Sequence, residues 1–384
     1  MDFTLSDTQR MLAETTDRLV RERYGFEERK KILTGPDGFS RPLWATFAEL
    51  GLTGLGIAEE HGGLGGSMAD IAVVAETFGR ALVVEPYMPT LVLGAGTLGL
   101  AGSAAQQAEF LPRVAVGELF LALAHGEPKS RYTLSHVETR AEADGGDYLL
   151  SGAKAVVLGG DAADHFLVSA RTHGGINEPH GVSLFLVPRT APGLGVRAYP
   201  NIDGTRAADL TLDRVRVPGS ALVGQAGTAL PVIAHAIDRA LAYLCAEAVG
   251  VMQALNALTL DYLKTRTQFG VPIGSFQVLQ HRMVDMEVAL EQARSMAILA
   301  ADRADDPHPG ERSRAVAAAK VQIGRSGRLI GQSAVQMHGG IGITDEYAGG
   351  HYFKRLTMID QLYGDADIHL THLARLGGLF GKAA

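Results

Sequence analysis

The chain has 384 residues, of which 46% are hydrophobic and 20% are charged, proportions typical of a globular protein rather than a disordered one. Its formal net charge is −7 and no long basic run occurs, so we expect no nucleic-acid-binding surface. A single cysteine, Cys245, excludes an intrachain disulfide and a multi-cysteine metal site. These features favour a reducing compartment, and we expect the cytoplasm.

Residues 1–118 have a helical pattern, with a capping box expected at Ser6 and Gln9. The start of the chain lacks the basic and apolar segments of a secretory signal. The segment 86–108 is uncharged and long enough to cross a bilayer, but Pro89 and several glycines interrupt it. We therefore predict an N-terminal α-helical domain and no membrane span.

Residues 119–226 change to a strand pattern. Short apolar runs are separated by Gly, Asp, Pro and His, and residues 208–218 alternate between apolar and polar. Regularly spaced short strands of this kind are typical of an antiparallel β-barrel or sandwich. We predict a middle antiparallel β-barrel domain.

Residues 227–384 return to long helices. In 275–302 apolar residues recur at three- and four-residue steps, and a similar pattern over 313–337 stops at Gly339. With 229–264 these segments predict an antiparallel helical bundle. The chain is thus expected to be an α+β multidomain protein.

Three segments of this last region could carry chemistry: 262–270 (YLKTRTQFG), 336–342 (QMHGGIG) and 361–367 (QLYGDAD). Separately, Arg266 could be a solvated cation, Phe269 a core aromatic, and the glycine pair at 339 and 340 a helix stop. Together they suit a diphosphate site, because guanidinium donors match phosphate oxygens and paired glycines let the backbone approach a ligand closely.

With these motifs in order, the chain resembles the acyl-CoA dehydrogenase family over nearly its whole length. Further matching segments are 44–66, Glu127-Pro128 and 213–218. The resemblance implies the acyl-CoA dehydrogenase fold, with a C-terminal four-helix bundle. It also implies FAD as cofactor, bound by Arg266, Phe269, Gln277, Gln336, Gly339 and Gly340.

The family's reaction, in lipid metabolism, is the α,β-dehydrogenation of an acyl-CoA thioester. It removes a proton from the α carbon and passes a hydride from the β carbon to the flavin. The resemblance implies an electron-transfer flavoprotein or a similar acceptor. It also implies a tetramer in which the C-terminal groups hold FAD bound mainly by a neighbouring subunit, either a homotetramer or an α2β2 heterotetramer with a related subunit.

The sequence departs from the family at the catalytic base. The usual C-terminal glutamate position is occupied by Tyr363, a phenol with an ordinary pKa of ~10 and a poor base at neutral pH. The other known base position falls at Ala240, followed by Leu241 where an Arg is usual. The flavin-facing Trp-x-Thr is replaced by Val156–Leu158, and the usual Gly-Ser-Asp by residues near Lys129–Arg131.

Three carboxylates could substitute for the base. Glu247 lies two helical turns after Ala240, and its alternative is a structural pair with an Arg. Asp365 could instead bond a ribose or cap a helix. Asp238 lies on a different helix face. The histidines have no metal-ligand spacing, and we predict no metal site.

Three functional interpretations remain open. The first is an FAD-dependent acyl-CoA dehydrogenase whose activity requires a partner subunit. The chain is similar, in this interpretation, to small subunits of pimeloyl-CoA dehydrogenase-type two-subunit enzymes. The second is a non-catalytic partner that completes the FAD site of a related subunit. The third is a flavin-dependent oxygenase on the same fold.

Overall fold

The computed structural model describes residues 4–378, which form two compact units. Of the described residues, the bundle unit comprises 4–31, 68–83 and 241–378, and the sheet unit comprises 32–67 and 84–240. Each unit combines segments from separate parts of the chain, so the two units do not correspond one to one with the three predicted domains. The three predicted domain ranges, 1–118, 119–226 and 227–384, therefore stay predictions.

Helices of the bundle unit begin with α1 (Asp7–Arg23), whose predicted capping box at Ser6 and Gln9 is confirmed. The others are α2 (Phe26–Thr34), α4 (Met68–Ala81), α7 (Leu230–Thr265), α8 (Gln277–Arg303), α9 (Pro309–His338), α10 (Ala348–Gln361) and α11 (Ala366–Arg375). The unit boundaries fall inside α2 and α7. A short hairpin of β9 (Thr267–Gln268) and β10 (Val271–Pro272) joins α7 to α8.

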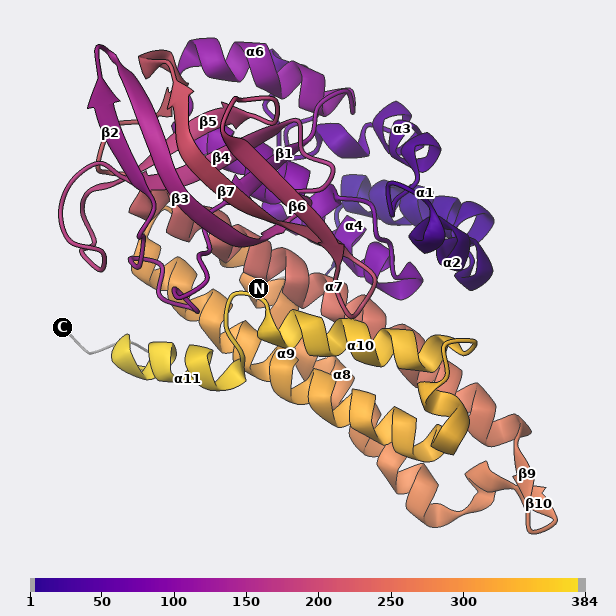
Figure 1. The fold of residues 1–384 in the computed structure, drawn as a ribbon. Helices are drawn as coiled ribbons and strands as arrows, with labels where there is room; N and C mark the ends of the chain where they lie inside the picture. Colours follow the sequence, from indigo (N-terminus) through magenta and orange to yellow (C-terminus); the bar gives the residue numbers. More distant parts are fainter. Residues whose placement is uncertain (1–3, 379–384) are drawn as a thin grey trace. The chain divides into compact units, whose positions relative to one another are not determined.

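The predicted bundle is formed by α7, α8, α9 and α10, the last three running alongside one another in orange to yellow (Figure 1). Asn256 of α7 donates to Glu287 of α8 at 3.2 Å, and Ser326 of α9 donates to the Ala289 carbonyl of α8 at 2.9 Å. Gly331 lets the Phe353 ring of α10 lie close to α9. Buried small residues on α9 permit this close helix packing.

The sheet unit contains one eight-stranded sheet in the order β6-β7-β3-β2-β4-β5-β8, with β1 paired to β4 (Figure 1). The strands are β1 (Leu121–Ala124), β2 (Arg140–Asp144), β3 (Asp147–Leu158), β4 (His165–Arg171), β5 (Val182–Pro188), β6 (Leu194–Pro200), β7 (Arg206–Val217) and β8 (Leu222–Val223). Helices α3 (Arg41–Glu49), α5 (Gly96–Ala101) and α6 (Ala104–Ala115) belong to the same unit, as does a π-helix at Met88–Ala95.

The predicted closed antiparallel barrel is wrong. The sheet is open, because β6 and β8 each pair on one side only and do not pair with each other. Pairing is also mixed, since β1 runs parallel to β4. The alternation of side chains reports which face of a strand is buried, but it does not report which strands pair. The core of the unit is apolar and includes Phe166, Phe185 and Val215.

One described helix, α7, is long and apolar enough to cross a membrane by length and composition. Within the structure 78% of its most apolar window is buried, as in the core helix of a bundle. The segment 86–108, which was considered as a span from its composition, is instead divided between the π-helix, α5 and α6.

Candidate functional site

The first candidate group lies at the C-terminal end of α7. Phe269 and Gly270 form the two-residue turn of the β9–β10 hairpin with φ of 53° and 81°, the signature of a type I′ turn. This turn leaves the Phe269 side chain 91% exposed. Arg266 precedes the hairpin and is exposed, and no described residue pairs with its guanidinium. The hairpin thus presents an available cation and an uncovered aromatic ring.

The glycine pair lies at the C-terminal end of α9. Gly339 has φ 65° and ψ −144°, which favours glycine, and Gly340 has open space where a side chain would start. The preceding His338 is buried; its Nδ1 donates to the Ala334 carbonyl at 2.8 Å and its Nε2 accepts from the Tyr347 hydroxyl at 2.9 Å. Burial lowers the pKa of His338, which keeps the imidazole ring neutral.

His338 also brings the two groups together. Its ring lies 4.6 Å from that of Tyr262, which sits one turn before Arg266 on α7. The end of α7, the start of α8 and the end of α9 therefore share one end of the bundle. These contacts give His338 a packing and hydrogen-bonding role.

The donors at this end of the bundle suit a diphosphate. Gln277 at the start of α8 and Gln336 near the end of α9 are exposed, and no described residue hydrogen-bonds to their amide groups. With the Arg266 guanidinium and the open backbone at Gly339-Gly340, they offer a charged fork and neutral donors to phosphate oxygens. These residues therefore fit the diphosphate of FAD.

Tyr363 lies in the turn between α10 and α11, with φ 58°. Its carbonyl accepts from His369 Nε2 at 3.1 Å. The fully buried Lys320 of α9 donates to the carbonyls of Asp360 at 2.8 Å and Gly364 at 2.6 Å. We did not single out Lys320 from the sequence; its one signal is a lysine in an otherwise apolar run, 315–321.

Burial controls the protonation of this turn. It raises the pKa of the Tyr363 phenol above its ordinary value, so the hydroxyl stays neutral. It also lowers the pKa of Lys320 to about 8 and that of His369 to about 4. Tyr363 thus keeps a neutral phenol and is unsuited to be a base at neutral pH.

Two of the three carboxylates considered as substitutes, Glu247 and Asp365, have other partners. Glu247 is buried and binds Arg355 of α10 through two bonds, Nε to Oε1 at 2.6 Å and Nη2 to Oε2 at 2.7 Å. This is the structural pair that was the alternative to catalysis. Asp365 caps α11, accepting from the backbone of Asp367 and Ile368 at 3.1 and 2.9 Å. Ala240, at the other base position, is fully buried.

Tyr363 and the residues expected to bind the diphosphate lie at opposite ends of α10. That helix has 14 residues, and a rise of ~1.5 Å per residue separates its ends by about 20 Å. The Gly342 carbonyl lies near Gly350 at its start, while Tyr363 follows its end. The two groups are therefore not parts of one small pocket within the bundle unit.

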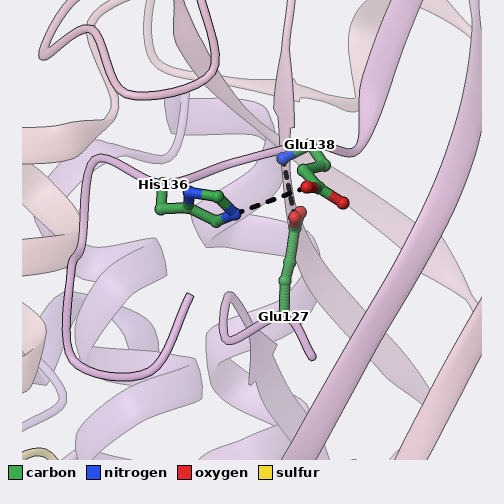
Figure 2. A group of neighbouring side chains, drawn as sticks. All are labelled: Glu127, His136 and Glu138. Carbon is green, nitrogen blue, oxygen red and sulfur yellow. Dashed lines mark hydrogen bonds and ion pairs between the residues drawn. The ribbon is translucent and has the colours of Figure 1, made fainter. Parts of the chain in front are cut away.

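In the sheet unit, Glu127 of the Glu-Pro element is buried. Its carboxylate accepts from Lys154 Nζ at 2.7 Å and from the backbone N–H groups of Glu138 and Thr139 at 2.6 and 3.0 Å. Figure 2 shows Glu127, Glu138 and His136. Each offers one atom that could bind a metal ion, a carboxylate oxygen or an imidazole nitrogen, and these atoms lie within 4.8 Å of one another. Because Lys154 and Lys129 already pair with the two carboxylates, this group is a hydrogen-bonded ion network.

Two segments where the sequence departs from the family pattern, Val156–Leu158 and the residues near Lys129–Arg131, are connected through a backbone hydrogen bond. The Ala155 N–H donates to the Gly126 carbonyl at 2.8 Å, which places Val156 next to the Glu-Pro element. Val156 is half exposed, whereas Val157 and Leu158 are buried. Lys129 and Arg131, in the segment after Glu127, are both exposed.

Comparison with known proteins identifies the class to which this fold and these motifs belong. Three profiles of the acyl-CoA dehydrogenase family match the chain: the N-terminal domain over residues 6–118, the middle domain over 122–215 and the C-terminal domain over 229–377. The chain belongs to the acyl-CoA dehydrogenase family and has that family's fold.

Individual relatives agree. The chain is 28% identical over 380 residues to the probable acyl-CoA dehydrogenase YngJ of Bacillus subtilis, covering 98% of this chain and 99% of the relative. It is 31% identical over 313 residues to the acyl-CoA dehydrogenase FadE12 of Mycobacterium tuberculosis, covering 79% of each.

Solved structures with the same fold include an FAD complex of PigA (26% identity, TM-score 0.91, covering 99% of this chain and 100% of that one). A glutaryl-coenzyme A dehydrogenase with glutaryl-CoA bound has 25% identity and TM-score 0.90, with coverage of 98% and 97%. The ChsE4–ChsE5 complex of Mycobacterium tuberculosis has 26% identity and TM-score 0.86, with 98% coverage of each chain. A chain in the structure of the electron transferring flavoprotein of Acidaminococcus fermentans has 26% identity and TM-score 0.90, with coverage of 98% and 99%.

Proposed function

We propose that this chain is an FAD-binding subunit of an acyl-CoA dehydrogenase-type oxidoreductase acting on an acyl-CoA thioester. We further propose that a related partner subunit supplies the catalytic base. One observation carries the proposal: the diphosphate-binding donors are available, while both base positions lack a usable carboxylate. Tyr363 is a neutral phenol, and Ala240 has no acidic group.

In this function Arg266 binds the diphosphate, with Gln277, Gln336 and the Gly339-Gly340 backbone as further donors. FAD, when bound, supplies the redox chemistry. Phe269 would lie against the cofactor, which removes an otherwise exposed ring from water. The stacked rings of His338 and Tyr262 hold the ends of α7 and α9 next to each other.

The missing base favours an α2β2 heterotetramer over a homotetramer, because a homotetramer would contain no subunit with a free carboxylate at the base position. We propose that the chain is similar to small subunits of pimeloyl-CoA dehydrogenase-type enzymes, and its likeness to the ChsE4–ChsE5 complex supports this assembly. We propose a cytoplasmic location, and an electron-transfer flavoprotein or a similar protein as electron acceptor.

A non-catalytic partner role is the second candidate, favoured by the same neutral Tyr363. Purification separates the candidates. A yellow protein that an acyl-CoA bleaches anaerobically, alone or with a co-expressed homologue, supports the dehydrogenase. A colourless protein, whose complex with the homologue owes its flavin and its bleaching to the homologue's own site, supports the non-catalytic role. Reduction by NAD(P)H with oxygen uptake would favour a flavin-dependent oxygenase instead.

Arg266→Ala tests the diphosphate assignment directly. Loss of a charged hydrogen bond costs roughly 1.5–3 kcal/mol, so FAD should bind about 10- to 100-fold more weakly. The neighbouring exposed cation in Lys264→Ala is the matched control and should leave FAD affinity unchanged. Equal flavin content in both variants would contradict the assigned site.

A further inference from the structure

A β-bulge interrupts the pairing of β3 with β7. Lys154 pairs with Leu210 and Val157 pairs with Ala208, so that Ala155 and Val156 together oppose Asp209. Bulges of this kind bend a strand and re-aim a side chain, and they are frequent next to active sites. This bulge lies beside Gly126 and the Glu-Pro element, through the Ala155 N–H bond to the Gly126 carbonyl.

Val156 has an unfavourable backbone conformation at the bulge. Its φ is 54°, in the left-handed region, where a β-branched residue is a true outlier. Its apolar side chain is also 50% exposed. Strain of this kind persists only where surrounding groups enforce it, and it is concentrated at functional sites.

Asp209 is the group that enforces it. Its Oδ1 accepts from the Val156 N–H at 3.1 Å and from the Tyr199 hydroxyl at 2.9 Å, and its Oδ2 accepts from Arg197 Nη2 at 2.6 Å. Burial raises the pKa of Asp209, but the hydrogen bonds from Arg197, the Val156 N–H and Tyr199 outweigh it and hold that pKa below its usual range. The carboxylate is therefore ionised, and it is fixed by Arg197 and Tyr199 of β6 on one side and by the Val156 N–H of β3 on the other.

We propose that Asp209 is a positioning residue for the flavin: it holds Val156 in the left-handed conformation so that the valine side chain forms a wall against the flavin ring. The inference rests on the proposed function, in which Val156–Leu158 take the place of the flavin-facing segment. Without the bulge, a one-residue change of register would turn Val156 to the opposite face of the sheet. In this proposal the flavin ring covers the exposed Val156 side chain when FAD binds.

The test uses FAD as the probe, with the wild-type protein alone or in its co-purified complex. Asp209→Ala should weaken FAD binding at least fivefold in a fluorescence titration and should shift the visible absorbance band of the bound flavin. Asp213→Ala, which removes an exposed carboxylate from the same strand, is the matched control and should change neither. Asp209→Asn, which keeps an acceptor oxygen for the Val156 N–H and leaves the valine in place, should retain FAD affinity to within twofold of the wild type.

A role confined to folding predicts the opposite: Asp209→Ala would melt at a lower temperature but bind FAD with wild-type affinity and spectrum. That result overturns the inference, as does an Asp209→Asn variant that binds FAD no better than Asp209→Ala. Should Asp209→Ala not fold, Val156→Ala tests the wall itself, and an unshifted flavin spectrum overturns the inference. A wild-type protein that binds no FAD contradicts the proposed function instead, so the two failures are distinguishable.

Discussion

The Glu247–Arg355 pair offers a sharp separation of structural and catalytic roles. Both side chains are almost fully buried and are joined by two charged hydrogen bonds of 2.6 and 2.7 Å. Glu247→Gln keeps the size of the side chain but leaves the Arg355 cation buried without its counter-charge. Breaking a buried pair in this way costs roughly 3–5 kcal/mol.

Calorimetry measures this effect as a shift of the melting temperature. At roughly 2–4 °C per kcal/mol for a unit of this size, Glu247→Gln should melt about 10 °C below the wild type. Glu311→Gln is the control: Glu311 pairs with Arg314 at 2.6 Å but is 62% exposed, so that loss should be below ~1 kcal/mol. Replacing both Glu247 and Arg355 by methionine should recover most of the stability, because an apolar pair of similar volume removes the buried charges.

A structural role for Glu247 also predicts that folded Glu247→Gln retains acyl-CoA-dependent bleaching of the flavin within about twofold. A change of ~1.4 kcal/mol in the barrier would instead alter the rate tenfold. A variant that melts like the wild type but no longer bleaches would refute the structural role and identify Glu247 as the base.

Two further predictions concern the Tyr363 turn. Burial lowers the pKa of His369 from an ordinary 6.5 to about 4, so its contribution to stability is present above pH 6.5 and is lost as pH falls toward 4. His369→Gln should therefore flatten the acid side of a pH–stability curve by about 3 kcal/mol, and an unchanged curve would contradict the assignment. Gly364 has φ 111° and a Cβ there would lie 3.0 Å from His369 Nε2, so Gly364→Ala should lose roughly 1–3 kcal/mol of unfolding free energy. Gly340→Ala, which meets open space, should keep its stability in the same denaturant titration but weaken FAD binding; equal destabilisation of both variants would argue against this account.

Helical elements could be predicted well because their signals are local. The capping box at Ser6 and the stop at Gly339 depend on hydrogen bonds within a few residues, and both are present. The sheet was harder, because β1 pairs with β4 more than 40 residues away in a register of Leu121 with His165. Alternation along a strand does not encode such a partner, and so the barrel prediction failed.

The sequence alone determined the order of helical and strand segments, the three C-terminal motifs and the family they indicate, because these depend on residue types at short spacings. Only the tertiary structure decided which side chains remain available. It packed Tyr262, one turn before Arg266, against His338, which precedes the glycine pair. It also paired Glu247 with Arg355 and held the Tyr363 turn with the buried Lys320. Each of these outcomes depends on contacts between helices distant in sequence, where burial and the pairing of charges set the chemistry of a residue.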